Sequence, residues 1–142
     1  FVRRCGKNAM KIMLDTNILI SAGVFPNSKV ARIVRMIALD CNIVISSYAI
    51  EELWRVTDRK FPDRKPIIER FLSELTYEIA YTPTIIKVED YPQIRDVADY
   101  PILASAMNAD VDILISGDKD FGDVDCERPK IMTIAKFEEQ YL

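Results

Sequence analysis

The chain has 142 residues, of which 49% are hydrophobic, and this is enough for one domain with a single core. Its 22 acidic and 19 basic side chains give a net charge of -3, which argues against a protein that coats nucleic acid through an overall positive field. Histidine is absent, so Ser-His-Asp catalysis, imidazole bases and histidine-containing zinc sites are excluded. Three widely spaced cysteines argue against a disulfide framework and favour a reducing cytoplasm.

The first residues are set apart from the rest of the chain. Residues 1–9 lack hydrophobic periodicity, and we interpret them as an upstream extension or a remnant of cloning. Residues 10–142 then form one domain. The apolar run over 12–25 contains Asp15 and Asn17 and is too short to span a bilayer. We therefore expect a cytoplasmic protein without a membrane segment.

Short apolar runs and helical apolar spacing alternate along the chain. In chain order the predicted elements are a strand over 11–15, a helix around 30–37, a strand over 42–46, a helix over 48–58 capped by Ser47, a helix from Pro66, weakly extended structure over 77–88, a helix over 99–108, a strand over 111–116, a strand over 130–133 and a helix over 135–142. This alternation predicts an α/β fold with three layers, in which a doubly wound, mainly parallel sheet carries helices on both faces.

Acidic residues follow the predicted strands. Asp15 ends the first strand, Glu51 and Glu52 lie early in the helix after the second strand, and Asp118 and Asp120 come just after the strand over 111–116. Ligands of parallel sheets bind beyond the carboxyl ends of the strands. The sequence therefore predicts a cluster of carboxylates at this edge.

Each acid also has an ordinary interpretation as a helix cap or a turn residue. Asp99 begins a predicted helix and joins the others only if the loop before it returns to the same edge. Two carboxylates about 4 Å apart repel each other by roughly 4 kcal/mol at an effective dielectric constant of ~20. A divalent cation removes this repulsion, and oxygen ligands favour Mg²⁺ or Mn²⁺. The pattern thus indicates metal-dependent phosphodiester hydrolysis by an activated water.

Four short motifs follow one another in the sequence. They are Leu-Asp-Thr-Asn-Ile-Leu at 14–19, Glu-Glu-Leu at 51–53, Arg-Asp-Val-Ala-Asp-Tyr-Pro-Ile-Leu-Ala at 95–104 and Ile-Ser-Gly-Asp-Lys-Asp-Phe at 115–121. Their order and spacing resemble those of PIN-domain ribonucleases that act as toxins in bacterial and archaeal toxin-antitoxin pairs. The resemblance extends over 10–142 and implies a Rossmann-like sheet and Mg²⁺- or Mn²⁺-dependent cleavage of RNA.

The resemblance also implies roles for individual residues. The implied catalytic acids are Asp15, Glu52, Asp99 and Asp118. Of these, the implied metal ligands are Asp15, Asp99 and Asp118. The implied supporting residues are Asn17, Ser116, Asp120 and Asp96, of which the last is either a supporting residue or an ordinary loop residue. The helical pattern does not decide between Glu51 and Glu52, and the family's Glu-Leu pairing favours Glu52.

Basic residues are concentrated in the segment 55–65, next to the Glu52 helix. Arg55, Arg59 and Lys60 are candidate contacts for RNA phosphates, and the alternative is an ordinary solvated helical face. The resemblance further implies a homodimer and an antitoxin protein that binds the acidic site.

Three other functions stay open at this point. A housekeeping RNA-processing nuclease would use the same site, and a catalytically idle binding module would lack some of the acids, of which none is missing. A phosphatase of the HAD-like class would place its nucleophile at Asp15 and normally carries a second Asp two residues later. Asn17 occupies that position.

Overall fold

A computed structural model of the protein describes residues 9–117 and 126–142. The elements of the described chain are β1 (Lys11–Leu14), α1 (Thr16–Val24), α2 (Lys29–Asp40), β2 (Asn42–Ser46), α3 (Ser47–Lys60), η2 (Pro62–Arg64), α4 (Lys65–Glu74), β3 (Tyr77–Ala80), η3 (Val88–Asp90), η4 (Val97–Asp99), α5 (Tyr100–Asn108), β4 (Ile113–Ile115), β5 (Lys130–Met132) and α6 (Ile134–Tyr141), where η marks a 3₁₀ turn. Within these ranges, no helix is long and apolar enough to cross a membrane.

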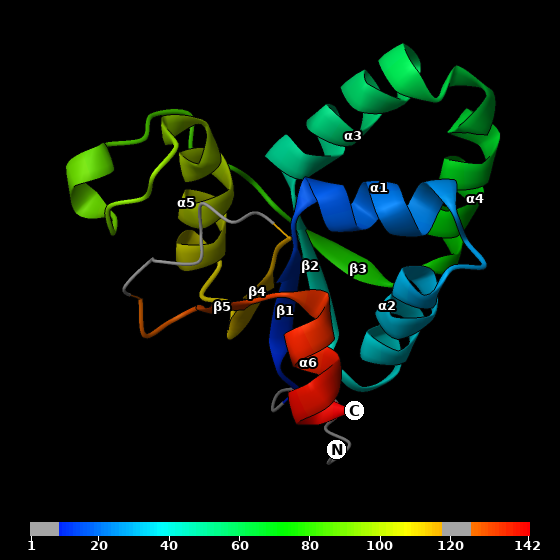
Figure 1. The fold of residues 1–142 in the computed structure, drawn as a ribbon. Helices are drawn as coiled ribbons and strands as arrows, with labels where there is room; N and C mark the ends of the chain where they lie inside the picture. Colours follow the sequence, from blue (N-terminus) through cyan, green and yellow to red (C-terminus); the bar gives the residue numbers. More distant parts are fainter. Residues whose placement is uncertain (1–8, 118–125) are drawn as a thin grey trace.

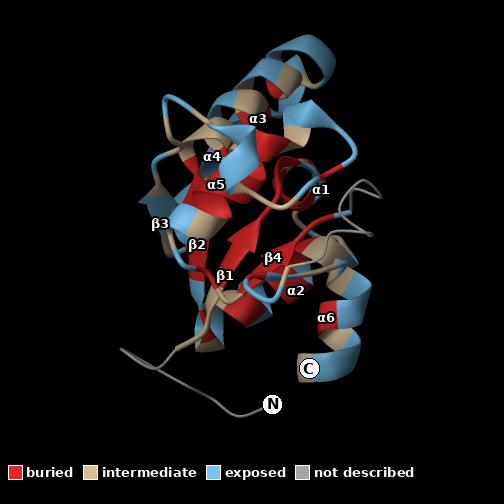
Figure 2. Cartoon of the chain, turned by 90° about the vertical axis from the view of Figure 1, so that its left-hand side faces the viewer, coloured by how far each residue is buried: buried red, intermediate tan, exposed pale blue. Residues whose placement is uncertain are grey.

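The strands form one sheet in the order β3-β2-β1-β4-β5, and every neighbouring pair is parallel. In Figure 1, α5 lies on one side of this sheet, whereas α1, α2 and α4 lie on the other. Figure 2 shows β1 and β4 buried between these layers. Ile12, Met13 and Leu14 of β1 are completely buried, as expected for a central parallel strand. The predicted doubly wound, parallel α/β fold is confirmed.

Two local features differ from the sequence-based expectations. No helix was predicted over 16–24, where α1 lies. Its buried residues face several directions, so the apolar run lacks the polar face that reveals an amphipathic helix. The prediction of Ser47 as the N-cap of α3 was wrong, because Ser46 caps this helix by accepting a hydrogen bond from Ala49 N at 3.0 Å. Two adjacent serines look alike as caps in the sequence.

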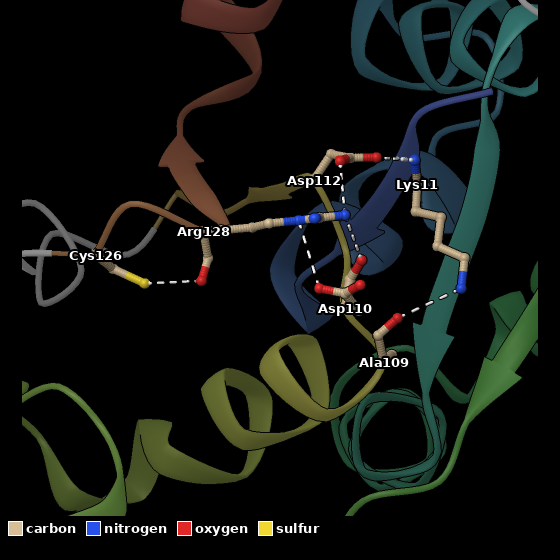
Figure 3. A network of polar contacts seen from close by, with 6 residues as sticks. All are labelled: Lys11, Ala109, Asp110, Asp112, Cys126 and Arg128. Carbon is tan, nitrogen blue, oxygen red and sulfur yellow. Dashed lines mark hydrogen bonds and ion pairs between the residues drawn. The ribbon is translucent and has the colours of Figure 1, made fainter. Parts of the chain in front are cut away.

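Ionic contacts tie together the edge of the sheet where the strands begin (Figure 3). Arg128 Nη2 donates hydrogen bonds to Asp112 Oδ1 at 3.0 Å and to the carbonyl oxygen of Asp110 at 3.1 Å. The other oxygen of Asp112 accepts a 2.8 Å hydrogen bond from Lys11 N, at the start of β1. These contacts join β1, the turn before β4 and the segment before β5 at the edge opposite to the strand carboxyl ends.

Candidate active site

Asp15 lies at the carboxyl end of the central strand and is only 7% exposed. Its backbone N–H continues the ladder with β4 by donating to the carbonyl oxygen of Ile115 at 3.0 Å. One carboxylate oxygen accepts from Thr16 N at 2.6 Å and so caps α1, and the other accepts from Ser116 Oγ at 2.7 Å. Asp15 is therefore a helix cap and also a buried carboxylate whose orientation is fixed by two donors.

Glu52 lies in the second turn of α3, the helix that follows β2 directly. Its Oε2 accepts a hydrogen bond from Tyr48 OH at 3.3 Å, one helical turn earlier. Burial raises the pKa of the Tyr48 phenol, and the nearby negative charge of Glu52 raises it further, because both disfavour the phenolate. Glu51 is exposed to solvent.

Asp99 ends the 3₁₀ turn η4, immediately before α5. This turn is held by Asp96, whose Oδ1 accepts from Ala98 N at 2.9 Å and whose carbonyl oxygen accepts from Asp99 N at 3.0 Å. Asp96 itself is exposed. The geometry thus makes Asp96 the cap of the turn that presents Asp99.

A cavity of about 460 Å³ joins these elements. The implied site residues that line it are Asp15, Asn17, Glu52, Asp99, Arg59 and Lys60. Ser116 contributes through its hydrogen bond to Asp15, whereas Glu51, Arg55 and Asp96 do not line the cavity. Acidic side chains from β1, α3 and η4 therefore share one hollow with two cationic side chains from the last turn of α3.

Comparisons with known proteins identify the family of this chain and a solved structure with a similar fold. The sequence model of the PIN domain matches residues 11–120, which is most of the chain. The chain belongs to the PIN-domain family. Among solved structures, the crystal structure of VapBC2 from Rickettsia felis bound to a DNA fragment from their promoter contains a similar chain, with a TM-score of 0.64 and 21% sequence identity. The match covers 87% of this chain and 97% of that chain and shows a shared fold.

No match was found among curated proteins. The family membership confirms the resemblance that the four motifs indicated, and it gives no support to a HAD-like phosphatase. The implied acids Asp118 and Asp120 fall within or at the end of the matched segment but lie outside the described residues.

The donors that line the cavity of this PIN domain are those of a hard cation. The carboxylates of Asp15, Glu52 and Asp99 line it, with neither imidazole nor thiolate in the lining. Thr16 Oγ1, beside Asp15, is buried and has no hydrogen-bond partner within the described part of the chain. Over 9–117 and 126–142, no three acidic or cysteine side chains gather closely enough to hold an ion.

Two features of the site were not found from the sequence. The first is the contact of Tyr48 with Glu52, although the spacing of four residues on a helix is a usable signal for it. The second is Thr16. Its burial beside the cavity has no signal in the sequence.

Proposed function

We propose that this protein is a metal-dependent endoribonuclease whose catalytic acids are Asp15, Glu52, Asp99 and Asp118. The observation that carries the proposal is that the first three of these acids, which come from three separate elements, line one cavity together. Membership of the PIN-domain family supports the inclusion of Asp118, which lies within the matched segment and shortly after β4 in the sequence.

Asp15, Asp99 and Asp118 would hold a Mg²⁺ or Mn²⁺ ion, which when bound supplies polarisation of a phosphoryl oxygen and activation of water. The protein's own residues prepare this site. Ser116 and the N-terminus of α1 fix the Asp15 carboxylate, and Tyr48 orients Glu52.

The remaining supporting residues are proposed from their positions. Asn17 lines the cavity and offers an amide that can orient a carboxylate or a water. Asp120 is proposed from its place two residues after Asp118. Asp96 acts only through the turn that it caps.

We assign the contacts to RNA phosphates to Arg59 and Lys60, which line the same cavity as the acids. They lie about two helical turns beyond Glu52 on α3, so an RNA strand whose scissile phosphate is at the acids has a neighbouring part of its backbone near these cations. Arg55 is exposed outside the cavity and is at most a peripheral contact.

We further propose that the protein is the toxin of a toxin-antitoxin pair, acts in the cytoplasm, forms a homodimer and is held inactive by an antitoxin protein. The family membership and the similarity in fold to a chain of a VapBC2 complex support this role. A housekeeping RNA-processing nuclease is the second candidate, because it would use the same site.

Purified protein, incubated with single-stranded RNA, single-stranded DNA and a phosphate monoester, tests the activity. We expect internal cleavage of RNA with Mg²⁺ or Mn²⁺, none with EDTA, and no release of phosphate from the monoester. Hydrolysis of the monoester alone would contradict the proposal.

Induced expression in a bacterial host tests the toxin role. The wild-type protein should stop growth, and the Asp15→Asn variant should not. Unaffected growth with an active, well-expressed protein would favour the housekeeping role instead.

A further inference from the structure

Two of the proposed catalytic acids lie on separate helices whose relative position must be fixed. Glu52 belongs to α3, and Asp99 directly precedes α5. The sheet fixes the start of α3, because this helix follows β2 without a loop. By contrast, α5 follows a long connection from β3 that contains only two 3₁₀ turns. A polar contact between α3 and α5 near these acids would therefore help to set their separation.

Thr82, in the segment that leaves β3, supplies that contact. On the side of α3, its Oγ1 accepts hydrogen bonds from Tyr48 N at 3.1 Å and from Ser47 Oγ at 3.3 Å. Its backbone N–H donates to Ser47 Oγ at 2.9 Å. On the side of α5, Thr82 Oγ1 lies 2.8 Å from Ser105 Oγ. One hydroxyl group thus touches both helices.

The direction of these hydrogen bonds follows from the number of protons. Ser105 Oγ–H donates to the carbonyl oxygen of Pro101 at 2.7 Å, so Ser105 Oγ accepts in its contact with Thr82. The Thr82 hydroxyl proton is then used toward Ser105, which leaves its lone pairs for Ser47 and the amide of Tyr48. The result is a chain of donors from Ser47 through Thr82 and Ser105 to Pro101.

The two ends of this chain adjoin the acids. At one end, Tyr48 is bonded to Thr82 through its amide and to Glu52 through its phenol. At the other end, Pro101 is two residues beyond Asp99, in the first turn of α5. A displacement of either helix start relative to the other would move one acid within the cavity and break a hydrogen bond of a half-buried hydroxyl.

We propose that Thr82 is a positioning residue for the ribonuclease reaction, which sets the separation of Glu52 and Asp99 by clamping the start of α3 to Ser105 in the middle of α5 and, through Ser105, to Pro101 in the first turn of α5. This inference rests on the proposed function. Thr82 does not line the cavity, so it acts only through the residues that it holds.

Three variants of the chain test the clamp. Thr82→Val keeps the shape of the side chain and removes the hydroxyl, whereas Thr82→Ser keeps the hydroxyl. Thr57→Val is the matched control, because the Thr57 hydroxyl lies on α3, is buried and donates within its own helix, to the carbonyl oxygen of Leu53 at 2.7 Å. Thermal unfolding of each variant shows that it is folded and how far its stability has changed.

We expect Thr82→Val to lower kcat for RNA by about ten- to a hundredfold while KM stays within about twofold, because small misplacements of reacting groups are costly. Thr82→Ser should return kcat to within about threefold of the wild-type value. Thr57→Val should keep the wild-type kcat, although its loss of thermal stability should be comparable to that of Thr82→Val.

Other results would overturn the inference in distinguishable ways. A folded Thr82→Val protein with the wild-type kcat would show that the clamp does not position the acids. If Thr57→Val lost as much kcat as Thr82→Val, the effect of Thr82→Val would come from a general loss of stability and not from the positioning of the acids. A wild-type protein that cuts no RNA with either metal would contradict the proposed function, and the inference would fall with it.

Discussion

Ser116 and Asp15 are 101 positions apart in the chain, and Ser116 Oγ donates a 2.7 Å hydrogen bond to Asp15 Oδ2. Both residues are buried at the carboxyl ends of the adjacent parallel strands β4 and β1. The register of this pair places Leu14 opposite Ile115, so the next residue of each strand faces the same edge. The fold therefore brings a hydroxyl donor to a carboxylate that it orients.

Removal of this donor should weaken both the site and the fold. In Ser116→Ala, the Asp15 carboxylate keeps its hydrogen bond from the Thr16 amide but loses the one from the Ser116 hydroxyl. We therefore expect the RNA-cleavage rate to fall by about tenfold and the free energy of unfolding to fall by about 1–3 kcal/mol. Urea unfolding and single-turnover cleavage measure the two effects. Ser116→Thr keeps a hydroxyl and should stay near the wild-type rate. Equal activity of the alanine variant would show that this hydrogen bond is not used.

The pairing of Tyr48 with Glu52 can be tested without any assay of cleavage. The negative charge of Glu52 disfavours the phenolate, so Glu52→Gln should lower the pKa of Tyr48 toward its ordinary value of 10.0. Glu51→Gln, next to it on the exposed side of α3, should leave the pKa of Tyr48 unchanged. Titration of ¹³C-labelled tyrosine by NMR measures both. The same pKa in wild type and Glu52→Gln would show that the contact is not formed in solution.

The assignment of Arg59 as a phosphate contact predicts a change in salt dependence. Arg59→Ala should raise the Kd for RNA by roughly the same factor for all RNA sequences. It should also make the plot of log Kd against log salt concentration shallower, by about the amount expected for the loss of one phosphate contact. Arg55→Ala removes the same charge from the same helix outside the cavity, so it should have a smaller effect. Filter-binding assays give these values when each protein also carries Asp15→Asn, so that the RNA is not cleaved. If the two variants weakened binding equally, α3 would act only as a general basic surface.

The sequence indicated the fold well because the fold depends on local patterns. Short apolar runs located β1, β2, β4 and β5, and their alternation with helices led to the parallel sheet. The edge that carries Asp15 follows from the strand direction alone. The helix α1 was missed because its apolar residues do not lie on a single face.

Side-chain contacts between distant elements were outside the reach of the sequence. The helical pattern left Glu51 and Glu52 equivalent, whereas only Glu52 lines the cavity in the structure. Likewise, Thr82 and Ser105 meet through the tertiary arrangement of β3 and α5, and neither residue type nor spacing predicts it. Asp118 and Asp120 rest on the motif alone, because they lie outside the described residues.

Cys41 should be an unreactive thiol. Burial, together with the negative charges of Asp40 and Asp112, raises its pKa from 9.0 to about 11. At pH 8, the fraction present as thiolate is then about a hundredfold lower than for an unperturbed thiol, so alkylation should be at least that much slower. A Cys5→Ser, Cys126→Ser double variant isolates Cys41, and the same protein unfolded in urea is the control.

This shift also affects stability at alkaline pH. Because the folded-state pKa of Cys41 is raised, the folded protein retains a proton that the unfolded chain loses, and stability should decline as the pH rises from about 9 to about 11.

In the alkylation experiment, rapid alkylation of the native double variant at pH 8 would contradict the burial of the Cys41 thiol.

The central claim, that carboxylates around Asp15 form a metal-dependent ribonuclease site, is tested most directly by the RNA-cleavage rate of Asp15→Asn with Mn²⁺. The amide keeps the size of the side chain and can still accept from Thr16 N, so α1 should stay capped and the protein folded. Glu51→Gln removes one negative charge outside the cavity and serves as the matched control. We predict a loss of at least a hundredfold for Asp15→Asn and an unchanged rate for Glu51→Gln. A folded Asp15→Asn protein that cuts RNA as fast as the wild type would contradict the account.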